Sequence, residues 1–592
     1  MPRHLSPAAA AAAALAFVAS APRVALAINN GLGQVPAMGY SSWNDCSSFR
    51  DNGPNGWCWD SEAHIKNVTL YMISSGLAKL GYTQINVDEG WLKGRNAQGE
   101  MYEDTDKFPS GMKALGDFIK SQPTYAGSPD MMRYGLYSCR GTCQCGTGTY
   151  NAPGSNGYEA ADTEWMVAAG AQYLKIDSCC GDQDHKVAFS DYGKWRDAMN
   201  ASGTKHGWDV WFSLCGWESW YSPPDPSLNY TGGASLGNSW RIAGDGSGWG
   251  PLTNCMNTQA AAAPFAGPGG WPDPDLLIGP QVYVGGQTDE QARAQFTMWS
   301  IFPTNLLISQ NVLAWSDYAL ETYSNAELIA INQDPLGSAA RRIAGGDLPF
   351  PCHGGGGGSG ALASVAAMPC DPANAGQLWS YDATSGLISS KAPAFAGGVL
   401  DNVGCAKADG SPVALYKADN GQGTCSGKNQ QWAWNSTTGV IVNSNTGTCL
   451  DVYNWQGPVV DVWTCNGGSN QKFVLSADGH LSSTAGSGPN QPAMCVTATV
   501  QPPQACSNVW GRALAGGDFA LGFVNNDVDQ TNSTVTCDAT CFAALLNGTA
   551  PASLKVRDLW QHADVATISP PFSWSASVPA SGAAAAFRLS PA

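Results

Sequence analysis

Charged side chains are scarce in this chain of 592 residues, and basic ones are the scarcest. Asp, Glu, Lys and Arg make up 13% of the residues, and 47 acidic residues against 30 basic ones give a formal net charge of −17. Proteins that bind nucleic acids or anionic membranes need a basic face. The composition therefore argues against both kinds of partner and favours a neutral ligand.

Histidine and long apolar segments are scarce as well. The 7 His are scattered without the spacing of metal ligands, and no Gly-rich loop follows a predicted strand as a phosphate-binding loop would. Neither a metal nor any other cofactor is therefore predicted. Beyond the N-terminus there is no run of about 20 uninterrupted apolar residues, so no membrane-spanning segment is expected.

The N-terminal segment has the pattern of a secretory signal peptide, which we assign to residues 1–27. Arg3 and His4 precede an Ala-rich apolar run, and Ala25-Leu26-Ala27 resembles a cleavage site. A chloroplast transit peptide is the alternative, against which the lack of Ser counts. The expected location is extracellular, including the cell wall, or an endomembrane lumen such as the vacuole.

The 19 Cys fit an oxidising compartment, and their odd number leaves at least one thiol unpaired. Sequons for N-glycosylation are also present, and with a signal peptide they become plausible glycan sites. They begin at Asn67, Asn200, Asn229, Asn435, Asn532 and Asn547.

From Asn29 to about Leu336, short apolar stretches alternate with helix-like ones such as Glu62–Leu80 and Lys113–Ser121. Apolar strands separated by helices indicate a parallel sheet. Seven strands, with an eighth near Trp271–Leu277, suit an α/β fold of the (β/α)8 barrel type. The seven are Ala37–Trp43, Thr83–Asp88, Tyr134–Ser138, Tyr173–Asp177, Val210–Cys215, Ser239–Ile242 and Leu306–Ser309.

Polar side chains stand where four of these strands end. An isolated Asp at a strand end is commonly a turn former or a helix cap, but four such ends point to an active site, because a barrel carries its site at the carboxyl ends of its strands. The residues are Asp88 and Glu89, Lys175 and Asp177, Arg241 and Asp245, and Asp273 and Asp275.

Between Cys352 and about Cys506 the composition changes, with fewer helix formers and more Gly, Asn, Trp and Cys. A Gln-x-aromatic pattern recurs there, which indicates an array of similar units, and Gly354–Gly358 is typical of a flexible linker. After Val509 apolar and polar residues alternate as in β-strands, which predicts a small antiparallel β-sandwich. The recurring segments are Gln377-Leu378-Trp379, Gln430-Gln431-Trp432 and Gln471-Lys472-Phe473.

Long ordered motifs carry a family resemblance. Over residues 29–345, and again over 509–592, the chain resembles glycoside hydrolase family 27, the α-galactosidases of clan D. The motifs include Met38-Gly39-Tyr40-Ser41-Ser42-Trp43-Asn44, Asn86-Val87-Asp88-Glu89-Gly90-Trp91, Tyr173-Leu174-Lys175-Ile176-Asp177, Asn238-Ser239-Trp240-Arg241, Gly267-Pro268-Gly269-Gly270-Trp271 and Asp273-Pro274-Asp275.

The resemblance implies that Asp177 is the nucleophile and Asp245 the general acid/base of a retaining glycosidase. Such an enzyme needs two carboxyl groups about 5–5.5 Å apart. Lys175 lies two residues before Asp177 on one strand, so it faces the same side, and its charge is expected to keep Asp177 ionised. The implied substrate-binding positions are Trp43, Asp88, Glu89, Tyr137, Lys175, Gly216, Trp217, Arg241 and Asp275.

Glu89 departs from the family pattern, which has a second Asp beside Asp88 to hold the O4 and O6 hydroxyls. One extra methylene reaches toward the place of the C6 hydroxymethyl group, which β-L-arabinopyranose lacks. The resemblance therefore leaves two interpretations open. Glu89 favours a β-L-arabinopyranosidase, or it is a tolerated Asp-to-Glu exchange, since one methylene is worth only about 1–3 kcal/mol of discrimination.

Two further positions depart from the pattern. Many relatives have a Glu that binds O2 where this chain has Gly216, which is expected to leave space for water, for Glu218 or for an N-acetyl group, with water favoured. Gly90 replaces a family Cys, so we expect Cys46 and Cys58 to pair locally. Cys179 or Cys180 is expected to pair with Cys145 or Cys143.

The repeat segment resembles a ricin-type β-trefoil lectin and is assigned to residues 351–507. Its clearest unit, which we call the middle unit, runs from Cys449 to Phe473. Gln-x-Trp residues of trefoils are mainly core, so only this unit is expected to bind a glycan. By the resemblance, its sugar-binding residues are Asp451, Trp463, Asn470 and Gln471.

The order of the units indicates a circularly permuted trefoil inserted into a loop of another domain. Its flanks, Arg341–Gly345 and Val509–Arg512, resemble one split hairpin of the family's C-terminal β-domain. We assign residues 28–340 to the catalytic barrel, and 341–350 with 508–592 to the antiparallel domain. The expected disulfides are Cys352–Cys506, Cys370–Cys495, Cys405–Cys425 and Cys449–Cys465.

Three functions are weighed. The first is a retaining exo-α-galactosidase acting on oligosaccharides, polysaccharides or glycoconjugates. The second is a β-L-arabinopyranosidase of the same family, and the third is a lectin with an inactive barrel. The intact set of Lys175, Asp177, Arg241 and Asp245 argues against the third.

Overall fold

The computed structural model describes most of the chain. The described residues are 30–45, 61–146, 152–280, 287–348, 352, 361–407, 409–419, 424–453, 459–483, 493–499, 506–527, 532–548 and 551–592. The expected signal peptide and the expected Cys46–Cys58 pair lie outside these residues.

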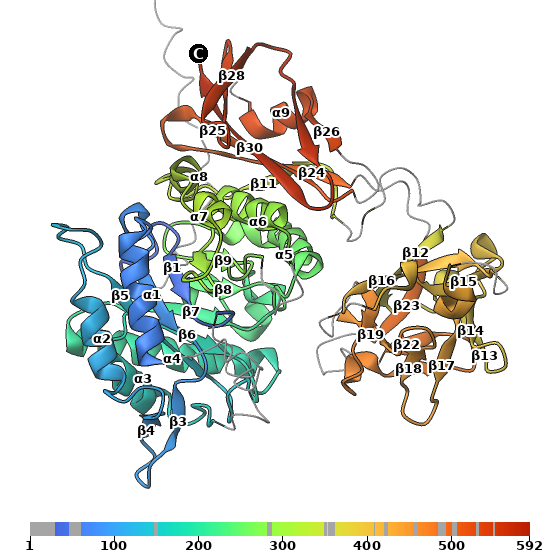
Figure 1. The fold of residues 1–592 in the computed structure, drawn as a ribbon, viewed down its shortest axis with the longest axis horizontal. Coiled ribbons are helices and arrows are strands. Elements are labelled where there is room, and N and C mark those ends of the chain that lie inside the picture. Colours follow the sequence, from blue (N-terminus) through green and yellow to red (C-terminus); the bar gives the residue numbers. More distant parts are fainter. Residues whose placement is uncertain are drawn as a thin grey trace, which may run out of the picture.

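An eight-stranded parallel sheet forms the first part of the structure (Figure 1). Its order is β10-β1-β2-β5-β6-β7-β8-β9, and a bridge from Leu277 to Ile308 joins the chain after β9 to β10. The predicted (β/α)8 barrel is confirmed. The strands are β1 (Met38–Ser41), β2 (Gln84–Val87), β5 (Arg133–Cys139), β6 (Tyr173–Asp177), β7 (Trp211–Cys215), β8 (Ser239–Arg241), β9 (Trp271–Asp273) and β10 (Leu306–Ile308).

Helices surround this sheet, and their ends follow local sequence signals. Helix α6 begins with a capping box in which Thr288 and Gln291 satisfy each other's backbone N–H groups, and α4 ends at Gly207 with φ 83°. The helices are α1 (Glu62–Ser74), α2 (Met112–Lys120), α3 (Glu159–Ala168), α4 (His185–His206), α5 (Trp249–Ala262), α6 (Asp289–Ile301), α7 (Asp317–Tyr323) and α8 (Ala326–Asn332), with a side hairpin of β3 (Leu92–Arg95) and β4 (Met101–Glu103).

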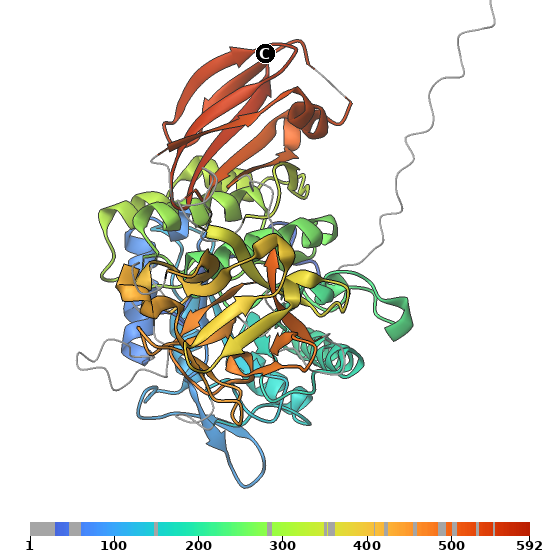
Figure 2. The ribbon, with the colours of Figure 1, turned by 90° about the vertical axis from the view of Figure 1, so that its right-hand side faces the viewer.

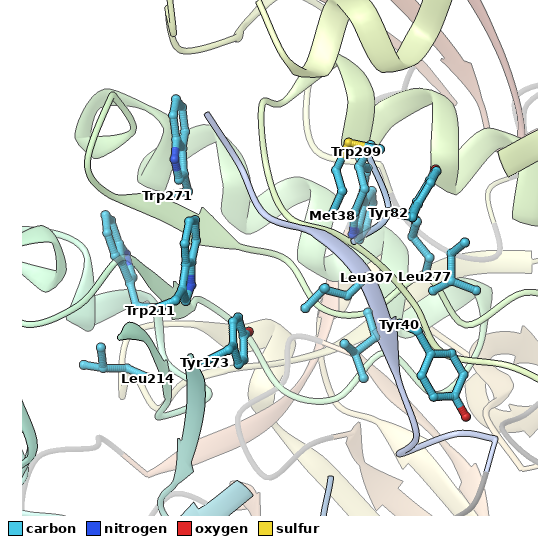
Figure 3. Packing of buried hydrophobic residues seen from close by; sticks show 14 of the residues in the cluster. Met38, Tyr40, Tyr82, Tyr173, Trp211, Leu214, Trp271, Leu277, Trp299 and Leu307 are labelled. Atoms are coloured by element: carbon cyan, nitrogen blue, oxygen red, sulfur yellow. The ribbon is translucent and has the colours of Figure 1, made fainter. Parts of the chain in front are cut away.

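Large buried side chains fill the space between strands and helices. Trp271, Trp299 and Tyr40 have no exposed surface, and Figure 3 shows them within one apolar cluster with residues from several strands. Burial of this much apolar surface holds the strands, and therefore their carboxyl ends, in a fixed arrangement. No helix among the described residues is long and apolar enough to cross a membrane.

The trefoil is built from short antiparallel strands around its own core. Trp379, Trp432 and Phe473, the aromatics of the three Gln-x-aromatic segments, are all buried in it. The first trefoil strand pairs with the last, as a permuted repeat requires. The strands are β12 (Ala361–Pro369), β13 (Trp379–Asp382), β14 (Leu387–Ser390), β15 (Gly398–Asn402), β16 (Ser411–Lys417), β17 (Trp432–Trp434), β18 (Ile441–Asn443), β19 (Cys449–Val452), β20 (Val460–Trp463), β21 (Phe473–Leu475), β22 (Leu481–Ser483) and β23 (Met494–Thr499).

A C-terminal antiparallel β-domain packs on the barrel beside α6 to α8 (Figure 1). Its strand β11 comes before the trefoil and pairs with β24 after it, so the predicted split hairpin is confirmed. The elements are β11 (Arg341–Ala344), β24 (Ser507–Ala513), β25 (Phe519–Asn525), β26 (Asn532–Cys537), α9 (Ala539–Leu546), β27 (Leu554–Asp558), β28 (Ala563–Ile568), β29 (Trp574–Pro579) and β30 (Ala583–Pro591).

Disulfides connect the loops. The four pairings given outright are confirmed, and the expected pairing of Cys179 or Cys180 with Cys145 or Cys143 is found twice, once for each cysteine. Within the described part of the chain the free cysteines are Cys139, Cys215 and Cys255, all buried. The pair Cys537–Cys541, between β26 and α9, was not predicted. The other pairs are Cys143–Cys180, Cys145–Cys179, Cys352–Cys506, Cys370–Cys495, Cys405–Cys425 and Cys449–Cys465.

Candidate active site

A cavity lies inside the barrel, among the carboxyl ends of the parallel strands. Its lining includes five of the predicted substrate-binding residues, and Asp177, Asp245, Trp43 and Glu89 are not part of that lining. The lining residues are Ser41, Asn86, Val87, Asp88, Leu136, Tyr137, Tyr173, Lys175, Ser213, Arg241, Asp273, Asp275, Leu276 and Leu307.

Asp177, the last residue of β6, is held by two donors. Its Oδ1 accepts the N–H of Ser178 at 2.9 Å, and its Oδ2 accepts the hydroxyl of Tyr137 at 3.1 Å. Asp177 is only 6% exposed. These two hydrogen bonds hold the carboxylate in one orientation.

Burial raises the pKa of Asp177 to about 6, with the charge of Lys175 lowering it and the charge of Asp245 raising it. The charge of Lys175 therefore favours the ionised form of Asp177, as expected, but the loss of water outweighs the ammonium charge, so the net shift of the pKa is upward.

Lys175 and Asp88 form a buried ion pair in the cavity wall. The Nζ of Lys175 donates to Oδ2 of Asp88 at 2.9 Å and lies 5.7 Å from the ring centroid of Trp43. Ser41 donates to the same carboxylate, and Ser42 accepts the N–H of Asp88 at 2.9 Å. These polar groups sit where sugar hydroxyls could exchange hydrogen bonds with them.

The roles of Ser41 and Ser42 were not predicted from the sequence. The signal for them was their place in the motif that ends β1, directly before Trp43. A hydroxyl at a strand end is too common to be singled out before the neighbouring strand is positioned.

Glu89 is turned toward a loop that follows β5. Its Oε1 accepts the N–H of Gly146 at 2.7 Å, and its Oε2 lies 3.4 Å from the hydroxyl of Tyr137. Glu89 is 1% exposed, and burial raises its pKa to about 7, with the charge of Asp177 adding to the shift. Glu89 and Asp177 thus share one hydroxyl between them.

Asp245 differs from Asp177 in being open to solvent, since 60% of its side-chain surface is exposed. The guanidinium of Arg241 bridges it to Asp275, with distances of 3.0 Å to each carboxylate. Asp275 also accepts the N–H of Gly246 at 2.6 Å and has a left-handed backbone, with φ 94°. A strained non-glycine residue of this kind is typical of functional sites.

Gly216 does not leave an open space, which corrects the expectation of a water-filled or N-acetyl pocket. A Cβ at this position would lie 1.9 Å from Cε2 and 2.3 Å from Cζ of Tyr221. The buried ring of Tyr221, in the 3-10 helix η3 (Ser219–Tyr221), fills the place. Trp217 follows with a left-handed backbone, φ 61°, and is partly buried.

The four predicted sugar-binding residues of the middle unit lie on neighbouring elements of the trefoil. Asp451 accepts hydrogen bonds from the side-chain amides of Asn470 and Gln471, at 2.9–3.0 Å. Trp463 lies on the neighbouring strand, opposite Cys449. Burial raises the pKa of Asp451 to about 6.

Three stretches of the chain match known families. Residues 35–334 match the family described as Alpha galactosidase A, residues 352–473 and 437–511 the Ricin-type beta-trefoil lectin domain, and residues 504–588 the Alpha galactosidase C-terminal beta sandwich domain. The first match covers more than half of the chain. The chain belongs to the α-galactosidase family of glycoside hydrolases.

Individual proteins with similar sequences are also α-galactosidases. Alpha-galactosidase 3 of Arabidopsis thaliana is 35% identical over 54% of this chain and 64% of its own length. The alpha-galactosidase of Cyamopsis tetragonoloba is 35% identical over 53% of this chain and 68% of its own. The matched part therefore spans about two thirds of each relative.

Solved structures share the fold. Alpha-galactosidase I from Mortierella vinacea aligns over 95% of this chain and 98% of its own, with a TM-score of 0.55 and 20% identity. A β-L-arabinopyranosidase from Geobacillus stearothermophilus aligns over 94% of this chain and 98% of its own, with a TM-score of 0.53 and 14% identity. At these identities the likeness concerns the fold alone.

Proposed function

We propose that this glycoside hydrolase is a retaining exo-α-galactosidase, in which Asp177 is the nucleophile and Asp245 the general acid/base. The observation that carries the proposal is the contrast between the two carboxyl groups. Asp177 is buried and held by two donors, whereas Asp245 is open to solvent beside Arg241. Two carboxyl groups in different environments suit two different roles.

In the first step, Asp177 attacks C1 of the galactosyl group and the bond from C1 to the leaving oxygen breaks. Asp245 gives its proton to that oxygen, so the leaving group departs as a neutral alcohol. Asp177 becomes a glycosyl ester, and its negative charge is lost. The hydroxyl of Tyr137, 3.1 Å from Oδ2 of Asp177, orients the carboxylate for this attack.

In the second step, Asp245, now a carboxylate, takes a proton from water, and the water oxygen attacks C1. The ester bond to Asp177 breaks, and galactose leaves with its original anomeric configuration. Arg241, bonded to Asp245 at 3.0 Å, holds that carboxylate in place between the two steps.

The groups in and beside the cavity suit a sugar as the ligand. Lys175 and Asp88 offer a donor and an acceptor for adjacent hydroxyls, and Trp43 supplies an apolar surface close to Lys175. The ring of Tyr221 fills the space beside Gly216, which argues against an N-acetyl pocket at that position.

Glu89 favours a second candidate, a β-L-arabinopyranosidase. Its carboxylate is longer by one methylene than the family's Asp and is turned to Gly146 and Tyr137. We place galactose first, because the extra methylene is directed into the loop contact with Gly146.

Paired kinetics on the p-nitrophenyl α-D-galactoside and β-L-arabinopyranoside test the proposal. We expect a higher kcat/KM on the galactoside, and NMR should show the α-anomer of galactose as the first product. A clear preference for the arabinoside would overturn the choice of sugar. First formation of the β-anomer would overturn the retaining mechanism.

The compartment and the glycan partners belong to the same proposal. The seven disulfides among the described residues fit an extracellular or endomembrane location, and the ricin-type trefoil supports binding of a glycan. The division of the chain into a barrel, an inserted trefoil and a C-terminal β-domain at the predicted boundaries is part of this proposal.

A further inference from the structure

A tyrosine of the trefoil touches the loop that carries Asp245. The hydroxyl of Tyr453 lies 3.0 Å from Oγ of Ser247 and donates to the main-chain carbonyl of Asp245 at 3.1 Å. Tyr453 is 7% exposed. Strand β19, which it follows, lies on the side of the trefoil that faces the barrel (Figure 1), and Figure 2 shows the trefoil in front of the barrel.

The strand pair β19 and β20 has one apolar face and one face of polar and aromatic side chains. Leu450, Val452, Val460 and Val462 all lie in the trefoil core. Because side chains alternate along a strand, the residues between them point to the other face. These are Asp451 on β19 and Asp461 and Trp463 on β20, and Tyr453 follows directly after β19.

Geometry agrees with this assignment. Asp451 and Asp461 are direct cross-strand partners, and the rings of Tyr453 and Trp463 have centroids 5.9 Å apart. The residue that contacts the barrel therefore belongs to the same surface as the predicted sugar-binding residues.

The neighbouring trefoil unit lacks these features. At the positions of Asp461 and Tyr453 it has Ala414, which pairs with Asp401, and Val403. Neither side chain can form the polar contacts seen in the middle unit. The contact with the barrel thus depends on residues particular to the middle unit.

Two buried oxygens on or beside this face have no hydrogen-bond partner. They are Oδ1 of Asp461 and Oδ1 of Asn470, in residues only 1% and 4% exposed. Leaving a buried polar atom unpaired is unfavourable. Ligand hydroxyls that donate to these oxygens would remove that cost, as sugar hydroxyls can.

The leaving group must depart on the side of Asp245. A general acid protonates the glycosidic oxygen, so the leaving sugar lies next to it, and Asp245 is the exposed member of the carboxyl pair. Tyr453 contacts the main chain of that residue. The first sugar beyond the galactosyl group is therefore directed toward the trefoil.

We propose that the middle unit of the trefoil is a leaving-group subsite of the catalytic pocket, in which Trp463 and Asp461 bind the sugars that follow the cleaved bond and Tyr453 holds this face of the trefoil against the loop of Asp245. The ligand is a neutral, hydroxyl-rich oligosaccharide or polysaccharide that occupies barrel and trefoil at once. This inference rests on the proposed function, because it takes Asp245 as the acid.

Steady-state kinetics of the full chain test the proposed subsite, with raffinose and p-nitrophenyl α-galactoside as substrates. The measured quantity is the ratio of kcat/KM on raffinose to kcat/KM on the aryl galactoside. Loss of an aromatic anchor typically costs more than about 1 kcal/mol of binding, so Trp463→Ala should lower this ratio about fivefold to tenfold. Trp463→Phe, which keeps a ring, should restore most of it.

Tyr416→Ala is the matched control, because Tyr416 occupies the position of Trp463 in the neighbouring unit. It should leave the ratio unchanged. Tyr453→Phe, which removes the hydroxyl that contacts Asp245 and Ser247, should lower the ratio in the same direction as Trp463→Ala.

The outcomes separate the two proposals. An unchanged ratio in Trp463→Ala, or an equal fall in Tyr416→Ala, overturns the subsite. A wild-type chain with no activity on the aryl galactoside contradicts the proposed function itself, and the subsite with it.

Discussion

At Asp177, burial and a neighbouring ammonium group act in opposite directions on one carboxyl. Burial raises its pKa to about 6, even though Lys175 lowers it. The presence of a Lys two residues away could be seen in the sequence, but the loss of water around Asp177 could not. The net direction of a pKa shift depends on both.

The pH profile of kcat/KM should reflect this shift. Because a nucleophile must be ionised, and its pKa is raised, kcat/KM on the aryl galactoside should fall as pH drops through about 6. Tyr137→Phe removes a hydrogen bond to the carboxylate, so it should move this limb to higher pH. A limb unchanged in the variant would contradict the role given to Tyr137.

Gly216 shows what a glycine in a sequence leaves open. The missing side chain was apparent, but the ring that fills its place comes from Tyr221, five residues on, and is brought back by η3. The sequence shows that Gly216 has no side chain, but it does not show that Tyr221 fills the resulting space.

Gly216→Ala should destabilise the barrel by about 1–3 kcal/mol, since its Cβ collides with the ring of Tyr221. Gly193→Ala is the control, because a Cβ there meets nothing within 4 Å and α4 favours Ala over Gly by up to about 1 kcal/mol. Urea unfolding of both variants checks this. Equal stability of the two would show that Tyr221 moves aside without cost.

At the scale of elements, the loop after β5 links the site to the disulfides. Cys143–Cys180 and Cys145–Cys179 tie this loop to the end of β6, and Gly146, next to Cys145, donates to Glu89. The disulfides thus fix the backbone group that orients Glu89. The sequence predicted one pairing among these four cysteines, but neither the second pair nor the contact of the loop with Glu89.

Replacing all four of these cysteines by Ser should lower both stability and activity. A loop closed over a sequence separation of 34 residues stabilises by about 4 kcal/mol in the chain-entropy model. The control is the double Ser variant of Cys537 and Cys541, whose separation of 4 gives about 2 kcal/mol and which lies in the C-terminal domain. We expect kcat/KM to fall at least about tenfold only in the first variant. Similar kinetics in both would contradict a positioning role for the loop.

Over the whole molecule, the trefoil interrupts a hairpin whose two strands still pair. Strands β11 and β24 pair in antiparallel fashion, with one register shift between Arg342 and Ala344, although residues 345–506 separate them, and Cys352–Cys506 joins the two ends of the insertion. The permuted order of the repeats and the split flanks allowed this insertion to be predicted. The contact of Tyr453 with the barrel could not be, because it depends on how two separately folded modules meet.

A chain in which a short turn joins β11 directly to β24 should therefore fold. Its kcat/KM on the aryl galactoside should stay within about threefold of the full chain, less than about 1 kcal/mol in barrier. On raffinose it should lose activity as Trp463→Ala does. Failure to form a folded barrel, seen by circular dichroism and thermal unfolding, would show that the trefoil is needed for folding.

The strand ends of the barrel were the most predictable part of the site, because apolar strands and the polar residues after them are local features. Asp88, Lys175, Arg241 and Asp275 all reach the cavity from those ends. Their partners across strands, such as Ser41 with Asp88, needed the register of the closed sheet. The family to which the chain belongs accounts for the order of these motifs.

Trapping of the glycosyl-enzyme tests the central assignment most directly. A fluorinated galactosyl fluoride whose ester hydrolyses slowly should label the enzyme once, and mass spectrometry of the digest should locate the galactosyl adduct on Asp177. An adduct on Asp245, or steady turnover of natural substrates with no covalent adduct and with inversion at C1, would contradict the account.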